Sequence, residues 1–292
     1  MQQIEIIKQV LPEFKINDYK ILNTGANSVA LMINNEYIFR FPLNKNNFES
    51  YLKEEKVLNI IRPYIKSVEI PQLNLYQYKD MYFTQHKMIK GIDYIKIKNP
   101  SKKLKQNLSK SLANFLFELH SIKDSKLDFI NVKQFNANAY NLNDKDNQKI
   151  LINTLQHNCI DDINKSLDFI NNYKNFKTEY NVLCHDDLHE ENILIQNDNL
   201  SGVIDFGCVV KRKYDTDFSN LLEYDIELGL MTIKEYEKLS NRKVDLKFAL
   251  SIQKIRCYGL LTDFIKENNE KYIKLFMTFL KNLELITNKI TL

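Results

Sequence analysis

Residues 185–192, which read HDDLHEEN, combine acidic and amide side chains at a spacing suited to phosphoryl transfer. Asp187 is followed five residues later by Asn192, and thirteen residues beyond Asn192 comes Asp205 in the segment VIDFG. In phosphoryl transfer one carboxylate orients the attacking hydroxyl, while an amide oxygen and a second carboxylate hold magnesium. We therefore predict that Asp187 faces the hydroxyl. Asn192 and Asp205 are predicted to bind Mg²⁺, a hard ion that prefers oxygen ligands.

The two histidines of this segment allow an alternative. His185 and His189 have the spacing of the zinc ligands in an H-E-x-x-H helix, although the residue after His185 is Asp186 rather than Glu. The flanking segments NVLC and NILI have the apolar, β-branched pattern of strands. A hairpin loop would not present the pair as a helix does, so we expect both histidines to fix the loop by hydrogen bonds.

A cation for the phosphates is expected from the N-terminal part of the chain. In LNTGANSVALMI, Gly25 and Ser28 would let backbone N–H groups approach phosphate oxygens. The next strand, YIFRFP, carries Arg40, and Glu54 follows on a predicted helix where it could pair with Arg40; Glu55 is the neighbouring candidate. Without the downstream motif, a plain β-turn and a surface arginine would be the simpler interpretation.

The elements that position these residues change character near Gly91. Helical spacing of apolar residues predicts helices within residues 1–14, 47–62, 102–122, 148–175 and 220–292. Alternation of apolar and polar residues predicts strands within residues 19–42, 73–88, 181–184, 193–196 and 202–204. A β-rich part followed by a larger helical part predicts an α+β, bilobal fold. Its divisions would be an N-terminal lobe at 1–89, a linker at 90–100 and a C-terminal lobe at 101–292.

The composition is that of a globular protein, with 44% hydrophobic and 27% charged residues in a chain of 292. No apolar run approaches the roughly 20 residues that a membrane helix needs, and the N-terminus lacks the apolar core of a signal peptide. The four cysteines form no C-x-x-C pair. We therefore expect neither a zinc knuckle nor disulfides, and a reducing, cytoplasmic compartment.

Charge is distributed unevenly, although the net charge is only +4. Residues 87–110 carry eight lysines and one acid, whereas residues 185–227 carry eleven acids and three bases. Acids gathered around the predicted chemistry favour a cationic ligand, metal ions or both, although half of them could simply lie on solvated helix faces. The lysine-rich stretch coincides with a linker and an amphipathic helix, so we expect no nucleic-acid binding.

Together these motifs resemble the aminoglycoside phosphotransferase family, whose members share a bilobal protein-kinase-like fold. The family's H-G-D-L-H-x-x-N signature matches His185, Asp187, Leu188, His189 and Asn192, and its metal loop matches Ile204 to Gly207. The helix end at Glu118 to Ile122 also matches the family. The resemblance is closest to aminoglycoside 2''-phosphotransferases. They share the YIFRFP-like strand, the Lys90-Gly91 step, and an acidic helix after Asp215 to Phe218.

Three positions depart from the family pattern. Arg40 replaces the phosphate-binding lysine, so a planar fork takes the place of a compact ammonium. Asp186 replaces the usual Gly or Asn and adds a charge beside the acceptor site. Cys208 ends the metal loop, where relatives often have a second acid. None of the three removes a catalytic group.

The resemblance implies an enzyme that moves the γ-phosphate of ATP or GTP to a hydroxyl of an aminoglycoside, with Asp187 as its catalytic residue. Backbone groups of Lys87 to Lys90 would bind the nucleobase, with Ile89 packing against it. The candidates for binding the cationic acceptor are the acids Asp186, Asp217, Glu223, Asp225 and Glu227. Asp217 could instead be a structural anchor of the catalytic loop.

Two other functions stay open at this point. One is a kinase of a different hydroxylated metabolite, such as choline, homoserine or a macrolide. The other is a non-catalytic, kinase-like binding protein, which the intact Asp187, Asn192 and Asp205 argue against. We also expect a monomer that binds no membrane.

Overall fold

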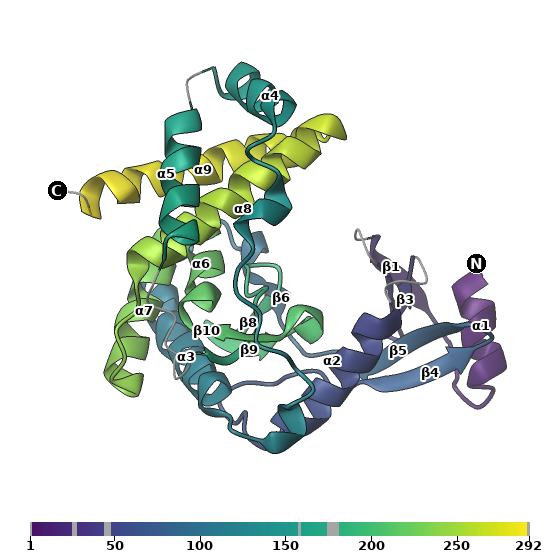
Figure 1. The fold of residues 1–292 in the computed structure, drawn as a ribbon. Coiled ribbons are helices and arrows are strands. Elements are labelled where there is room, and N and C mark those ends of the chain that lie inside the picture. Colours follow the sequence, from purple (N-terminus) through teal and green to yellow (C-terminus); the bar gives the residue numbers. More distant parts are fainter. Residues whose placement is uncertain (1, 25–27, 44–47, 157–158, 174–180, 291–292) are drawn as a thin grey trace.

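A small antiparallel sheet and a larger helical body lie side by side in the computed structural model (Figure 1). The structure describes residues 2–24, 28–43, 48–156, 159–173 and 181–290. The α+β arrangement predicted from the sequence is confirmed. Among the described helices, none is long and apolar enough to cross a membrane.

The small lobe is a five-stranded antiparallel sheet in the order β1-β2-β3-β5-β4. Its elements are α1 (Gln2–Val10), β1 (Tyr19–Thr24), β2 (Ser28–Ile33), β3 (Tyr37–Pro42), α2 (Phe48–Ile61), β4 (Asn74–Tyr78) and β5 (Met81–Lys87). Asn34 and Asn35 join β2 to β3 with φ of 56° and 52°. Two left-handed residues give the turn whose twist matches that of the flanking strands. These two asparagines therefore form the turn between β2 and β3.

The large lobe places two short sheets among its helices. Its helices are α3 (Lys102–Ser121), α4 (Lys145–Leu155), α5 (Ile160–Asn171), α6 (Asp215–Tyr224), α7 (Ile226–Ser240), α8 (Leu246–Lys266) and α9 (Glu270–Ile290). Its strands are β6 (Ile92–Asp93), β7 (Asn181–Cys184), β8 (Ile193–Gln196), β9 (Asn199–Val203) and β10 (Val210–Lys213). Strand β8 pairs with β6 and β9, and β7 pairs with β10.

The strands β7 and β8 position the HDDLHEEN segment. Strand β7 ends at Cys184 and β8 begins at Ile193, so the segment is the loop between them. The hairpin β8–β9 turns through Asn197 and Asp198, both with positive φ. It returns the chain to Ile204, whose N–H donates to the carbonyl oxygen of Asn192 at 3.1 Å. This bond places the metal-loop motif beside the end of the loop.

Buried apolar side chains form two clusters. The smaller one joins α1 to one face of the sheet through residues such as Ile7, Phe39 and Phe83. The larger one fills the helical lobe and includes Val57 and Leu58 of α2. The core of α2 thus belongs with the large lobe, although α2 precedes β4 and β5 in sequence. The division at residues 89 and 100 stays a prediction.

Candidate active site

The loop between β7 and β8 is not helical, so it does not present His185 and His189 as a zinc helix would. His185 is buried, and its Nε2 donates to the carbonyl oxygen of Ile204 at 3.1 Å. His189 lies with its Nε2 3.7 Å from a carboxylate oxygen of Asp187 and 3.2 Å from the amide nitrogen of Asn192. Both histidines therefore contact the loop and its neighbours, as expected for residues that fix its shape.

Asp187 and Asn192 meet across this loop. The Asn192 amide nitrogen donates to the Asp187 carbonyl oxygen at 2.8 Å. It also lies 3.4 Å from the Asp187 carboxylate. These contacts use the amide nitrogen of Asn192, so its side-chain oxygen is available to bind a metal ion. The Asp187 carboxylate is 37% exposed, which leaves it accessible to a substrate.

Asp205 follows Ile204, the residue whose N–H is bonded to Asn192. Its φ of 64° lies in the left-handed region, and it precedes the short 3₁₀ turn η6 (Phe206–Cys208). Its carboxylate is 49% exposed. The oxygens of Asp205 and Asn192 are the hard donors that magnesium prefers. The two residues therefore fit a magnesium site.

Arg40 and Glu54 form the ion pair expected from the sequence. Arg40 on β3 contacts Glu54 on α2 through one guanidinium nitrogen, and its other terminal nitrogen lies 3.5 Å from Asp205. Burial opposes the charge of Arg40, but Glu54 and then Asp205 outweigh it and raise its pKa. Glu54 also accepts a hydrogen bond from the Phe206 N–H at 3.1 Å. Glu55 accepts from Asn59 instead.

The remaining nucleotide-site candidates lie around the same sheet. Ser28 begins β2 opposite Pro42, and Gly25 lies outside the described residues. Lys87 ends β5 and is exposed, which fits a role for its backbone rather than its side chain. Ile89 is buried against Gly202, where an added Cβ would lie 2.5 Å from the isoleucine. Ile89 thus packs on the β8–β9 hairpin beneath the catalytic loop.

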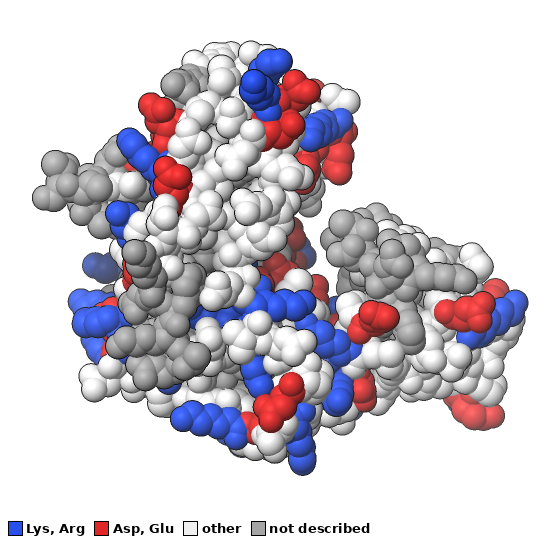
Figure 2. Space-filling view, viewed as in Figure 1, with Lys and Arg blue, Asp and Glu red and all other residues white. Residues whose placement is uncertain are grey.

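A cavity of about 680 Å³ opens beside Asp187. Its walls carry six acids, Asp186, Asp187, Glu190, Glu191, Glu223 and Glu267. Arg256 is the single lysine or arginine among its lining residues. Figure 2 shows acidic side chains at the bottom of the hollow between the lobes. A separate cavity of about 530 Å³ between α1 and the β4–β5 turn is lined by none of the predicted site residues.

The structure brings only two of the five predicted acceptor acids to this cavity. Glu223 lines it and accepts a hydrogen bond from Gln253 at 2.6 Å; burial raises its pKa to about 7. Asp186 also lines it, but its carboxylate already meets Arg256 at 2.9 Å and Arg212 at 3.2 Å. The charge that Asp186 adds is therefore balanced within the protein.

Asp225 and Glu227 have structural partners instead. Asp225 accepts from Tyr94 at 2.7 Å and caps α7 by accepting from the Leu228 N–H. Lys105 lies 3.0 Å from Asp225 and 2.9 Å from Glu227. Neither acid lines the acceptor cavity. The turn from α6 into α7 points both acids toward α3, so the contact with a cationic acceptor that was predicted for them stays a prediction.

Asp217 anchors the catalytic loop from below. It is completely buried, and its two carboxylate oxygens accept from the backbone N–H groups of His185 and Asp186 at 3.0 and 2.7 Å. His120 lies 2.9 Å away and also contacts Tyr236 at 2.9 Å. Burial opposes the charge, but the His120 hydrogen bond leads the effects that lower the pKa of Asp217. Asp217 does not reach the cavity, so a substrate contact is wrong and the anchor alternative fits.

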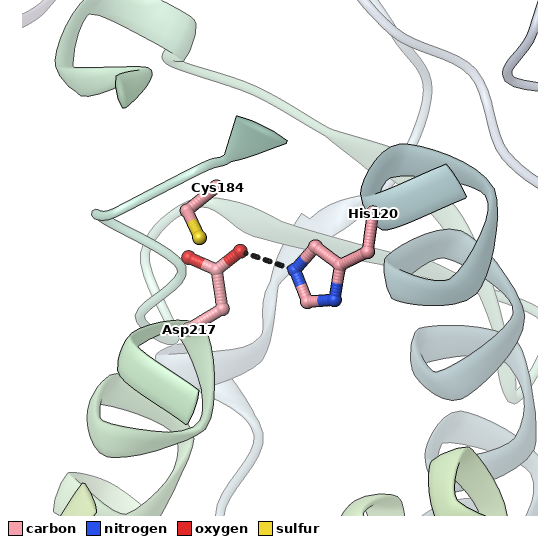
Figure 3. Close-up of side chains that lie close together, drawn as sticks. All are labelled: His120, Cys184 and Asp217. Atoms are coloured by element: carbon pink, nitrogen blue, oxygen red, sulfur yellow. Dashed lines mark hydrogen bonds and ion pairs between the residues drawn. The ribbon is translucent and has the colours of Figure 1, made fainter. Parts of the chain in front are cut away.

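Cys184 lies beside this pair, as Figure 3 shows. Its sulfur and the donor atoms of His120 and Asp217 all lie within 4.8 Å of one another. Burial, followed by the charge of Asp217, raises the pKa of the Cys184 thiol well above its usual value. A protonated thiol is a poor metal ligand, and the oxygens of Asp217 are already used. The three residues are thus explained as a buried anchor.

Several residues of the site were not predicted from the sequence. Arg256 on α8 and Arg212 on β10 reach Asp186 from different elements. Glu190 is buried, and its carboxylate accepts from the Tyr224 N–H at 3.2 Å. Arg256 did leave one signal that it shares with Lys254, because cations in the largely apolar stretch IQKIRCYGLL need partners where they are buried. The partners of the other two depend on tertiary structure.

The sequence matches the model of the phosphotransferase enzyme family, APH, over residues 18–242. The chain belongs to this family. Among solved structures, the GDP and kanamycin complex of APH(2'')-IIIa superposes with a TM-score of 0.77 at 18% identity, covering 97% of this chain and 98% of that one. The gentamicin complex of APH(2'')-IIa gives 0.65 at 24% identity, covering 96% and 95%. The macrolide 2'-phosphotransferase MphH from Brachybacterium faecium gives 0.67 at 10% identity, covering 96% and 97%.

These similarities confirm the kinase-like fold of this APH-family chain. At such identities the solved structures establish the fold alone. The match to the phosphotransferase family places phosphoryl transfer to a small molecule on the chain. The three departures from the family pattern each have a simple structural setting. Arg40 pairs with Glu54, Asp186 pairs with Arg256, and Cys208 is exposed to solvent.

Proposed function

We propose that this chain transfers the γ-phosphate of ATP or GTP to a hydroxyl of an aminoglycoside in a magnesium-dependent reaction. The observation that carries the proposal is the meeting of two groups of residues around Asp205 in the metal loop. Asp187 and Asn192 come from the catalytic loop, and the Arg40–Glu54 pair comes from the sheet and α2. Asp205 contacts Arg40 and so connects the two groups.

Each residue has a separate role in the proposed mechanism. Asp187 accepts or orients the proton of the acceptor hydroxyl as its oxygen attacks phosphorus. Asn192 and Asp205 would hold magnesium, which supplies charge neutralisation to the phosphates when bound. Arg40 lies next to Asp205 with a fixed positive charge for phosphate oxygens, and Glu54 orients it. Binding and orientation carry most of the catalysis, because phosphoryl transfer requires little covalent chemistry from the protein.

An aminoglycoside is favoured as acceptor by the charge of the cavity. Six acids and a single arginine line a space of about 680 Å³ together with apolar residues of α8 and α9. Although Asp186 is balanced by Arg256 and Arg212, the other acids favour a ligand that carries positive charge. Two of the similar structures are complexes with kanamycin and gentamicin, which supports the same substrate class. A macrolide or another hydroxylated metabolite is the alternative acceptor within the family. The similar fold of the macrolide 2'-phosphotransferase MphH supports this alternative.

The free thiols of all four cysteines are consistent with the reducing, cytoplasmic compartment that we propose. We propose further that the enzyme acts as a monomer. Within the described residues, the two lobes of a single chain supply both the Arg40–Glu54 pair and the Asp187–Asn192 contact.

A coupled turnover assay tests the function. The purified chain is given kanamycin, gentamicin, choline, homoserine or a macrolide, with ATP and GTP separately and with magnesium or a chelator. We expect magnesium-dependent turnover with an aminoglycoside. Turnover only with another acceptor would overturn the aminoglycoside proposal, and nucleotide binding without any turnover would favour the non-catalytic alternative.

Asp187→Ala is the matched variant for this assay. Loss of the proton acceptor should lower kcat by about 10² to 10⁴, while nucleotide affinity measured by calorimetry stays unchanged. Asp161→Ala, an exposed acid on α5, serves as the control. Turnover of Asp187→Ala at the level of the control would remove Asp187 from the mechanism.

A further inference from the structure

Helix α2 holds the backbone of the metal loop through two consecutive side chains. Glu54 accepts a hydrogen bond from the Phe206 N–H at 3.1 Å. Lys53, the residue before it, directs its ammonium to the carbonyl oxygens of Val209 and Gly207, the latter at 3.5 Å. The Glu54 carboxylate thus accepts from a backbone N–H of the loop, and the Lys53 ammonium donates to two of its backbone carbonyl groups.

Lys53 provides a hydrogen-bond donor to backbone carbonyl groups at the end of the metal loop. The last carbonyl groups of a helical turn have no partner within the turn and are commonly satisfied by a lysine or arginine. Residues 206–208 form the 3₁₀ turn η6, and Val209 is its C-terminal cap. Within the described chain, the ammonium of Lys53 is directed to these carbonyls rather than into an ion pair. Lys53 therefore caps this turn from another element.

The residue that precedes the turn needs such support. Asp205 has a φ of 64°, in the left-handed region, which costs an aspartate more than it would cost a glycine. The bond from the Ile204 N–H to Asn192 holds one side of Asp205, and the contacts with α2 hold the other. Val57 and Leu58 fix α2 in the core of the large lobe, so the support comes from a rigid element.

We propose that Lys53 is a positioning residue for the metal ligand Asp205. Together with Glu54 it ties residues 205–209 to α2 and sets the Asp205 carboxylate before nucleotide and magnesium bind. The reaction that this arrangement serves rests on the proposed function. The clamp itself is a property of the free protein and is testable without turnover.

Hydrogen–deuterium exchange of the ligand-free protein tests the clamp. In Lys53→Met we expect the amides of residues 206–209 to exchange at least about tenfold faster, because the turn opens more often. Lys53→Arg keeps a donor and should restore most of the protection. Lys56→Met is the matched control, since Lys56 lies one turn along α2 and contacts the ring of Phe129 instead. Wild-type exchange in Lys53→Met, or equal acceleration in Lys56→Met, would overturn the clamp.

Magnesium dependence of turnover tests the consequence for Asp205. In Lys53→Met the magnesium concentration for half-maximal rate should rise severalfold, with the KM for the acceptor unchanged, and Lys53→Arg should reverse most of this rise. Faster exchange with an unaltered magnesium dependence would overturn the positioning role. If the wild-type chain shows no turnover, the proposed function fails, whereas the exchange experiment still decides whether Lys53 holds the loop.

Discussion

Arg40 contacts acids from two different elements, Glu54 on α2 and Asp205 on the metal loop. A guanidinium can do this because its terminal nitrogens are held apart in a rigid plane, whereas an ammonium is a single point of charge. The substitution of the family lysine by Arg40 thus keeps the positive charge and adds a second fixed contact. Its cost is a bulkier group next to the phosphates.

Replacing Arg40 tests whether it is the phosphate cation. Arg40→Lys restores the family residue and should keep the pair with Glu54, so we expect a folded enzyme with a KM for nucleotide changed by less than about tenfold. Arg40→Ala should raise that KM by more than tenfold, roughly the loss of one charge-assisted contact. It should also lower stability by about 3–5 kcal/mol, because Glu54 is left buried and unpaired. Steady-state kinetics with varied nucleotide and urea denaturation measure the two effects, and an unchanged KM in Arg40→Ala would exclude the phosphate role.

Glu223 should make acceptor binding depend on pH. Burial raises its pKa to about 7, so in the free enzyme the carboxyl is neutral below that pH and charged above it. Binding of a cationic acceptor should therefore strengthen as pH rises through about 7, by up to roughly tenfold per unit. The acceptor KM between about pH 6 and pH 8 is compared for the wild type and Glu223→Gln. If the wild-type profile persists in Glu223→Gln, another group is responsible.

The contribution of Glu223 to folding stability has the opposite dependence on pH, because it falls as the pH rises. The pKa of Glu223 is about 4.5 in the unfolded chain, whereas burial raises it to about 7 in the folded chain. Stability that the protonated group contributes is complete below about pH 4.5 and is lost as the pH rises to about 7. The enzyme thus loses some folding stability over the range in which Glu223 becomes able to bind a cation.

At the scale of elements, the catalytic loop depends on three helices that lie outside it. Asp217 on α6 holds two of its backbone N–H groups, and His120 on α3 and Tyr236 on α7 complete the buried network. Because both carboxylate oxygens are used, the network has no polar alternative if one member is removed. The loop therefore derives its shape from these helices as well as from the hydrogen bonds among its own residues.

Asp217→Asn should break this network. The amide group cannot accept with both atoms, so a buried N–H of the loop loses its partner, and we expect a loss of about 3–5 kcal/mol in the free energy of unfolding. Since the pKa of Asp217 is lowered in the folded state, the difference from the wild type should shrink as pH falls below the usual range of an aspartate. Urea denaturation at several pH values measures it, with the exposed Asp161→Asn as control. Equal stability of the two variants would contradict the anchor.

The sequence predicted features that depend on neighbouring residues better than contacts between residues that are far apart in the chain. The strands around HDDLHEEN and the asparagine turn were predictable, since period-two patterns and turn residues are local signals. The Arg40–Glu54 pair was favoured only by the downstream motif, because the two residues lie fourteen positions apart on different elements. The start of α6 at Asp215 was missed, because acidic residues hide its apolar stripe. The roles of Asp225 and Arg256 were not accessible, because their partners lie on α3 and on the catalytic loop, far away in sequence.

At the scale of the whole molecule, the two clusters of buried apolar residues do not divide the chain in sequence order. The sheet and α1 make one cluster, while α2, which lies between β3 and β4 in sequence, packs its apolar residues into the other. The residues that we propose for nucleotide and metal are therefore shared between two cores. Arg40 is carried by the smaller core, and Lys53, Glu54 and Asp205 are carried by the larger.

This placement has a consequence for how nucleotide enters and leaves. The salt link between Arg40 and Glu54 spans the boundary between the two cores. A swing of the sheet away from the helical lobe would have to separate these opposite charges while they are still largely shielded from water, which is unfavourable. The pair thus opposes separation of the two cores, and for the function that we propose its strength would influence how quickly nucleoside diphosphate leaves. In such an enzyme, weakening the pair could hasten product release even as it loosens the grip on the incoming triphosphate.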